Sequence, residues 1–277
     1  MTNERTTKVK PRRPYIHVIK SLSQVLKINR EVETPIWVAG QADHDHWGEW
    51  PIRITIWNIF KGAGGEHFYN DFRMLSFQSD ILMIQEALLS RRSLHDLTPL
   101  GFGVVHSASY ERADRLRDGV MTISRVQTQG DPQRILCKYP EPVLKTPKVA
   151  LVTFYQLGVL RPSLMVVNMH ATLFRSIKRA VEELDHLIAL LPVHDGPMIF
   201  AGDFNTFTPR YFQAICSKLE SLGLSYVSVP DDPRRSLDHL DQLFVRGLTV
   251  SEIEVDTRVH SSDHFPIRAT IHLPPLS

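Results

Sequence analysis

Side chains that could do chemistry recur where the strands predicted from the sequence begin or end. Amide, carboxylate or imidazole groups finish the stretches ITIWN, LMIQE, MVVNMH and IFAGDFN, and they also occur at the start of LDQLF and in SSDHF. Each alone is explained by a turn, a helix entry or a hydrogen-bonded core histidine. Their repetition predicts one shared site, because ionisable groups at strand tips are costly unless they are paired or bind a metal. The residues are Asn58, Gln85, Glu86, Asn168, His170, Asp203, Asn205, Asp241, Asp263 and His264.

The donor types in this set favour a hard divalent cation. The carboxylates of Glu86, Asp203 and Asp263, with the amide oxygens of Asn58 and Asn205, suit Mg²⁺, with Mn²⁺ as an alternative, and suit zinc poorly. A divalent ion, a carboxylate that orients water and an imidazole together fit the attack of water on a phosphorus centre. The ion and an imidazole such as His264 would stabilise the charge that develops on the phosphoryl oxygens.

Other catalytic and metal-binding patterns are weaker. The chain has no Gly-x-x-x-x-Gly-Lys-Ser/Thr loop and no Gly-x-Ser-x-Gly elbow, so an ATPase and a serine hydrolase are disfavoured. The stretch QADHDHWGEW (41–50) carries two aspartates and two histidines. Alternate residues of an extended segment point to opposite faces, so we expect a surface turn there, flanked by packed Trp47 and Trp50.

The elements that must position these residues change character near residue 51. Residues 1–14 are basic and without apolar periodicity, which predicts a flexible segment. Residues 15–50 are predicted to form an extension with one short amphipathic helix, and residues 51–277 one catalytic domain. Short apolar strands alternate there with helices, such as the apolar stripe over 176–191, and this pattern is typical of a layered α/β fold. The stretches 108–118 and 228–240 are predicted to be polar loops, facing either substrate or solvent.

Composition places the chain among ordinary globular proteins. Its 277 residues include 43% hydrophobic and 22% charged residues, and the formal net charge is +2. Only Cys137 and Cys216 occur, so a reducing compartment is expected. We find no apolar stretch near the roughly 20 residues that span a bilayer, and no signal-peptide pattern. These observations predict a cytoplasmic monomer without stable membrane association or an obligate protein partner.

The ordered motifs WNI, QE, NMH, GDFN, LDQLF and SDH, spread over residues 51–275, resemble the endonuclease/exonuclease/phosphatase superfamily. Its members include deoxyribonuclease I, exonuclease III-like repair enzymes, neutral sphingomyelinases and inositol polyphosphate phosphatases. The chain is most similar to the bacterial YafD-like subgroup, through WNIFK, GVMTIS, VVNMHA and AGDFN. The resemblance implies a four-layer α/β sandwich, in which two facing mixed sheets are flanked by helices and the site lies at one edge.

The resemblance also implies roles for the metal-binding residues. Glu86 corresponds to the principal metal ligand, supported by Asn58, and Asp263 completes the metal environment directly or through water. Phe60 stands where abasic-site repair enzymes carry an acidic metal-site residue. Lys61 is expected either to reach phosphate or to be an ordinary exposed lysine at a strand end.

The remaining positions are implied to do the chemistry. Asp203 orients or deprotonates the nucleophilic water, and Asn205 holds a phosphate oxygen. His264, oriented by Asp241, contacts the scissile phosphate. His170 falls where deoxyribonuclease I and sphingomyelinase-like members have histidine, whereas the abasic-site repair enzymes have tyrosine, so the resemblance disfavours that group.

Three functions follow from these patterns. The leading hypothesis is a Mg²⁺-dependent phosphodiester hydrolase that acts on nucleic acid, DNA or RNA, as an endonuclease or an exonuclease. Its support is the set of site residues together with the basic N-terminus and loop arginines that could follow a phosphate backbone. The alternatives are a phospholipid, inositol phosphate or phosphomonoester hydrolase (phosphatase) of the same superfamily, and a non-catalytic binding protein on this fold. The arginines are Arg112, Arg115, Arg117, Arg234 and Arg235.

Overall fold

The computed structural model describes residues 28–29, 32–142, 145–158, 161–173, 176–234 and 240–273. The basic segment 1–14, the short helix expected after Tyr15 and Arg235 lie outside the described residues. Ile36–Gly40, which the sequence assigns to an extension, forms β2 and pairs antiparallel with β5 (Gly103–Arg112). This part of the extension is therefore a strand of the first sheet.

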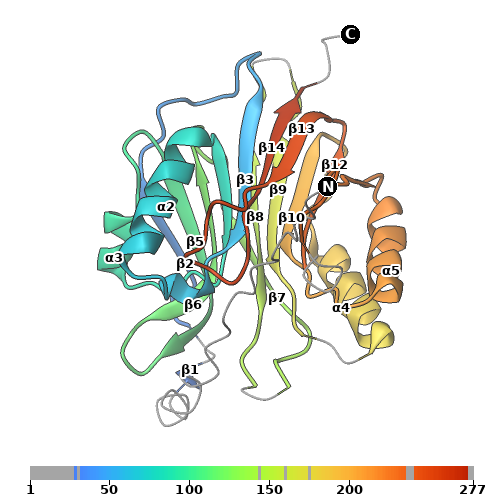
Figure 1. Ribbon diagram of the computed structural model, residues 1–277, viewed down its shortest axis with the longest axis horizontal. Helices are drawn as coiled ribbons and strands as arrows, with labels where there is room; N and C mark the ends of the chain where they lie inside the picture. The colour runs from blue at the N-terminus through green and yellow to red at the C-terminus, as the bar shows by residue number, and fades with distance from the viewer. Residues whose placement is uncertain are drawn as a thin grey trace, which may run out of the picture.

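Two mixed sheets form the centre of the molecule (Figure 1). Over the described residues, the first has eight strands, ordered β1-β5-β6-β4-β3-β14-β13 with β2 beside β5, and the second has six, ordered β11-β12-β10-β9-β8-β7. The first sheet also contains β1 (Ile28–Asn29), β3 (Ile52–Asn58), β4 (Ile81–Gln85), β6 (Arg117–Ser124), β13 (Thr249–Val255) and β14 (Ile267–His272). The second contains β7 (Gln133–Leu136), β8 (Val149–Tyr155), β9 (Leu164–His170), β10 (Met198–Asp203), β11 (Ser225–Tyr226) and β12 (Asp241–Arg246).

Helices cover the outer face of each sheet. In Figure 1, α2 (Glu66–Gln78) and α3 (Arg91–Asp96) lie beside the first sheet, and α4 (Ile177–Leu190) and α5 (Pro209–Glu220) beside the second. One apolar cluster joins inward side chains of both sheets, and two more join each sheet to its own helices. These three buried layers confirm the predicted four-layer α/β sandwich. The predicted helix over 176–191 is also confirmed, and Ser176 caps it by accepting a hydrogen bond from the Arg179 backbone NH.

A buried amide pair links the two sheets beneath the site. Asn168 on β9 and Gln85 at the end of β4 are both fully buried, and Gln85 Nε2 donates to Asn168 Oδ1 over 2.7 Å. Asn168 Nδ2 in turn donates to the carbonyl of Met121 over 3.0 Å. Because buried amides without partners are costly, these bonds fix how the two sheets meet. These two polar residues are thus structural and lie behind the site.

Two local expectations are wrong. Residues 108–118 are not a long loop, because β5 continues to Arg112 and β6 begins at Arg117. Polar residues can occupy these strands because Arg117 Nε and Glu111 Oε2 form a buried ion pair over 2.8 Å. In 41–50, Trp47 is buried as expected, but Trp50 is 44% exposed. His44 and His46 form isolated parallel β-bridges with Val126 and Gln156.

Candidate active site

Strand register brings the predicted residues to one edge of the sandwich. In the second sheet Asp203 at the end of β10 lies opposite His170 on β9 and Asp241 on β12. In the first sheet the end of β3 carries Asn58. The two edges meet where Asn58 Nδ2 donates to Asp203 Oδ2 over 3.0 Å. Residues from strands far apart in the sequence thus converge because their ends coincide.

Asp203 is held as a buried carboxylate acceptor. Besides Asn58, its Oδ1 accepts the backbone NH of Asn205 over 3.0 Å, and its side chain is 3% exposed. Asn205 adopts a left-handed backbone (φ 53°) and donates its side-chain amide to the Ala171 carbonyl over 2.8 Å. Burial raises the pKa of Asp203 to about 6, against the lowering effect of the charge on His264. Asp203 can therefore take up a proton near neutral pH, as a general base requires.

His264 and Asp241 form a buried ion pair. His264 Nδ1 lies 2.7 Å from Asp241 Oδ2, and the two side chains are 14% and 2% exposed. Burial alone would lower the pKa of His264, but the charge and hydrogen bond of Asp241, with the charges of Asp203 and Asp263, raise it to about 10. His264 is therefore an imidazolium at neutral pH, and its Nε2–H is the group that can meet an anionic oxygen.

The two serines before His264 explain its placement. Ser262 Oγ donates to the Asn58 carbonyl over 2.6 Å and accepts the His264 backbone NH over 3.3 Å. Ser261 Oγ donates to Asp71 on α2 over 2.7 Å. Trp57 Nε1 donates to the His264 carbonyl over 3.1 Å. The segment before β14 is therefore fastened to the end of β3, which brings His264 across to Asp241 in the other sheet.

Glu86 lies near a lysine and a histidine, but neither is close enough to form a hydrogen bond with its carboxylate. It follows β4 with φ 53°, and its oxygens are 4.0 Å from His170 Nε2 and 4.0 Å from Lys61 Nζ, too long for hydrogen bonds. Burial would raise the pKa of Glu86, but the charges of Lys148, Lys61 and His264 and a hydrogen bond from Asn58 outweigh it, so the pKa is lowered. Glu86 is therefore an anionic carboxylate at neutral pH.

His170 faces a lysine that the sequence motifs do not identify. Lys148 Nζ lies 3.1 Å from His170 Nε2, and the Lys148 side chain is 14% exposed. Burial, followed by the charges of Lys148, His264 and Lys61, lowers the pKa of His170 well below its usual value, so this imidazole is neutral. The available signal was a lysine directly before the apolar strand β8, whose first residue pairs with His170.

Asp118 is the second site residue that the sequence motifs do not identify. In the sequence it stands among arginines in a stretch expected to be a loop. In the structure it lies on β6 and is 2% exposed, and its Oδ2 is 4.0 Å from Lys61 Nζ. Burial raises the pKa of Asp118, and the charges of Lys61 and Lys148 lower it by less. A carboxylate at the start of an otherwise apolar strand was the signal.

The arginines expected to follow a phosphate backbone are engaged with protein groups. Arg117 is buried, pairs with Glu111 and lies over the Trp37 ring. Arg115 pairs with the same carboxylate over 3.0 Å, and Arg112 with Asp114 over 2.7 Å. Arg234 is 8% exposed and pairs with Asp232 over 2.7 Å. These side chains stabilise strands and loops of the protein itself.

Two sets of residues could hold a cation, and their chemistry separates them. Ligand atoms of Asp203, Asp241 and His264 lie within 4.8 Å of one another. The imidazolium of His264 already donates to Asp241 and has no free lone pair, so this set is a proton-bearing dyad beside a base. Glu86, Asn58 and Asp263 offer oxygen donors, and the Glu86 contacts are long. Burial raises the pKa of Asp263, the charge of His264 opposes this, and the charge of Glu86 adds to the increase. These three residues fit a hard divalent cation.

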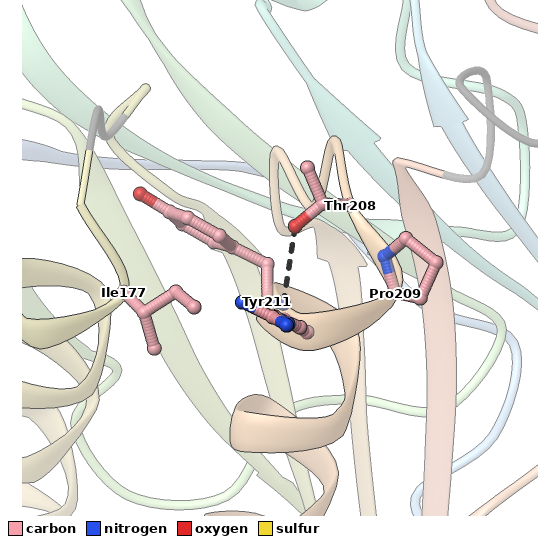
Figure 2. A pocket seen from close by; sticks show the side chains of 5 residues that line it. Ile177, Thr208, Pro209 and Tyr211 are labelled. Atoms are coloured by element: carbon pink, nitrogen blue, oxygen red, sulfur yellow. Dashed lines mark hydrogen bonds between the residues drawn. The ribbon is translucent and has the colours of Figure 1, made fainter.

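An open cavity of about 650 Å³ lies between the first turns of α4 and α5. Figure 2 shows the Tyr211 ring between Ile177 and Thr208, whose Oγ1 accepts the Tyr211 backbone NH. Arg210 and Pro209 complete the lining. Because Thr208 follows Asn205 by three residues, the Cα atoms of the two are at most about 11 Å apart.

The fold and this site define an α/β sandwich hydrolase of phosphate esters. Residues 56–264 match the model of the Endonuclease/Exonuclease/phosphatase family. The chain belongs to this family, as its motifs predicted. None of the helices in the described residues has the length and apolar character needed to cross a bilayer.

Similar proteins have been found in sequence and in structure. A UPF0294 protein of Vibrio vulnificus (strain YJ016) is 30% identical over 229 residues, covering 80% of this chain and 78% of the relative. The human Nocturnin catalytic domain with bound sulfate superposes with a TM-score of 0.58 at 19% identity, covering 86% of this chain and 98% of that one. ANGEL2, a 2′,3′-cyclic phosphatase, superposes with a TM-score of 0.57 at 16% identity, covering 83% and 97%. At these identities the two structures are evidence for the fold.

Proposed function

We propose that this protein is a Mg²⁺-dependent phosphodiester hydrolase that acts on nucleic acid by in-line attack of water. The observation that carries the proposal is a buried carboxylate base and an imidazolium, Asp203 and His264, which lie side by side with a ring nitrogen of His264 within 4.8 Å of a carboxylate oxygen of Asp203. A phosphate bound at this edge would have Asp203 as the proton acceptor for the attacking water and His264 as a hydrogen-bond donor. No nearby serine or cysteine is needed as a nucleophile.

Each residue of the site has a role that follows from its contacts. Asp203, with a pKa of about 6, accepts the proton of the attacking water. His264 donates to a phosphoryl oxygen as negative charge develops there, and Asp241 keeps it protonated. Asn205 presents its amide at the same edge. Glu86, Asn58 and Asp263 would hold the divalent ion, which when bound polarises the phosphoryl group.

Nucleic acid as the substrate rests on the cavity whose lining includes Thr208, three residues after Asn205. The Tyr211 ring offers a face for stacking a base, and Arg210 offers a positive charge for a neighbouring phosphate. The fold relative ANGEL2 is a 2′,3′-cyclic phosphatase whose structure is also known with adenosine-2′,3′-vanadate, a nucleoside compound, and this is compatible with the choice. The paired arginines of β5, β6 and the loop before β12 do not contribute to the proposal.

A phospholipid or other phosphoester substrate is the second candidate, favoured by exposed apolar side chains beside the site. Phe60 is 40% exposed two residues after Asn58, and Leu173 is 39% exposed three residues after His170. Apolar groups beside a phosphate site suit an apolar leaving group or a lipid surface. In either case we propose a cytoplasmic protein, because both cysteines of the chain are free, and we propose that it acts as a monomer.

The test is hydrolysis by the purified wild type and by His264→Ala, in Mg²⁺ and then in Mn²⁺. Substrates are single- and double-stranded DNA, RNA, a sphingomyelin analogue and phosphoinositides. His272→Ala, which removes a partly exposed histidine on the outer part of β14, is the matched control. We expect nucleic acid to be cleaved by the wild type and the control and not by His264→Ala. Cleavage confined to a lipid would replace the proposed substrate, and no cleavage of any substrate would refute the function.

A further inference from the structure

Lys61 stands between two carboxylates of the site. Its Nζ is 4.0 Å from Glu86 Oε2 and 4.0 Å from Asp118 Oδ2. Glu86 follows β4 and Asp118 lies on β6, so two neighbouring strands present their acids to one ammonium group. The Lys61 side chain is 43% exposed, so this cation also faces solvent.

Asp118 needs a cation nearby. Its side chain is 3% exposed, and within the described residues its Oδ2 is buried without a hydrogen-bond partner. Oδ1 has a long contact with Ser109 Oγ, 3.4 Å. A buried carboxylate oxygen without a bond is strongly unfavourable unless a positive charge lies close to it. The described contacts give that role to Lys61, and Lys148 contributes to the same field.

The backbone is arranged to aim Lys61 at these acids. Phe60 and Lys61 both have positive φ, 47° and 58°, in the short helix η1 (Phe60–Gly62). The turn is held because Asn58 Oδ1 accepts the Phe60 backbone NH over 3.1 Å, and because the Gly62 NH donates to the Ile59 carbonyl over 2.9 Å. Left-handed conformations of residues other than glycine cost energy and are typical of functional sites.

We propose that Lys61 is the built-in second cation of this site: it occupies the position that a second divalent ion would take between Glu86 and Asp118, and it contacts the phosphate of the substrate. The distances agree, since Mg²⁺ retains waters and is held by carboxylates through them at about 4 Å. The chain therefore requires a single divalent ion, held by Glu86, Asn58 and Asp263. This inference rests on the proposed function for the contact with phosphate, but not for the number of ions.

The test counts Mn²⁺ ions without substrate, by electron paramagnetic resonance of the free ion during titration. We expect one ion on the wild type, two on Lys61→Ala and one on Lys61→Arg, whose side chain keeps the charge. The double variant Lys61→Ala with Asp118→Asn should return to one ion. Lys218→Ala, which removes an exposed lysine paired with Asp185 over 2.6 Å, is the matched control and should bind one.

Two results would overturn the inference: a wild type that binds two ions, or a Lys61→Ala variant that is folded by circular dichroism and still binds one. Should Lys61→Ala not fold, Lys61→Met keeps the aliphatic stem and answers the same question.

A second test uses the substrate found active. The kcat/KM of Lys61→Ala in 1 equivalent of Mn²⁺ should fall roughly 10- to 100-fold, the size of a lost charge-assisted contact, and excess Mn²⁺ should restore part of the activity. Because the ion count needs no substrate, failure of the proposed function leaves it measurable.

Discussion

The Asp241→Asn variant tests whether a buried ion pair keeps His264 protonated at physiological pH. Asp241 Oδ2 lies 2.7 Å from His264 Nδ1, and the charge and hydrogen bond of this residue are the leading influences that raise the pKa of His264 to about 10. The asparagine keeps the shape and removes the charge. The pKa of His264 should then fall toward its ordinary value, about 6.5.

The expected size of the effect follows from the protonated fraction. At pH 7.5 a histidine with a pKa of about 10 is almost fully protonated, whereas one with a pKa near 6.5 is protonated in about one molecule in ten. If the imidazolium is the active form, kcat/KM at pH 7.5 should therefore fall about tenfold. The activity should be regained as the pH is lowered toward 6.

The assay is the pH dependence of kcat/KM between pH 5 and 10.5, on the substrate found active. In the wild type activity should rise as the pH passes about 6, where Asp203 loses its proton, and fall as the pH approaches about 10, where His264 loses its own. In Asp241→Asn the falling limb should move down by several pH units. A falling limb that stays near 10 would refute the assignment of this limb to His264 and of its elevation to Asp241.

The control for this variant is Asp256→Asn, another buried aspartate in an ion pair. Asp256 is 3% exposed and accepts from Arg258 over 2.7 Å, outside the site residues. Its loss should change stability without moving either limb.

The wild type and Asp241→Asn should also differ in how stability depends on pH. A histidine whose pKa is raised by folding stabilises the native state below the unfolded pKa, and this contribution is lost as the pH rises through the folded pKa. The wild type should therefore lose stability relative to Asp241→Asn as the pH approaches about 10.

Three further changes test the other residues. Asp203→Asn removes the base and should lower kcat by roughly 10² to 10⁴ with little change in KM, measured by steady-state kinetics; an unchanged kcat would exclude this carboxylate as the base. Glu86→Gln should weaken Mn²⁺ binding at least tenfold by calorimetry, whereas the exposed Glu66→Gln on α2 should not. Asn168→Ala removes the bond from Gln85 Nε2 to Asn168 Oδ1 and the bond from Asn168 Nδ2 to the Met121 carbonyl, and should cost about 1 to 3 kcal/mol of unfolding free energy in urea, against a change within about 0.5 kcal/mol for Asn70→Ala on the surface.

Much of the fold could be predicted from the sequence, for reasons that particular elements make clear. The stripe along 176–191 predicted α4, because a helix that buries one face needs apolar residues at its own period. The alternation of short apolar runs with helices predicted the layered sheets. The prediction of a loop at 108–118 was wrong. Glu111 and Arg117 form a buried ion pair across two paired strands, and the polarity of a short stretch of sequence does not show such a partner.

The chemical groups that reach the edge of the sandwich could be identified from the sequence. Strand tips end in Asn58, Glu86, His170 and Asp203, and this depends on local periodicity and on the order of the motifs. The sequence could not determine which groups change their protonation. The charge of His264, the neutrality of His170 and the raised pKa of Asp203 depend on burial and on partners from strands far apart in the chain.

Two lysines are assigned to the site by the folded structure and not by the sequence. Lys148 directly precedes a strand and Lys61 follows one, and a lysine at a strand end is usually exposed to solvent, so their positions in the sequence left that outcome open. Their roles follow from distances of 3.1 Å between Lys148 and His170 and 4.0 Å from Lys61 to Glu86 and Asp118, which exist only after strands distant in the sequence have paired within each sheet. Electrostatic interactions fall off with distance and grow with burial, and neither quantity is written in the order of the residues.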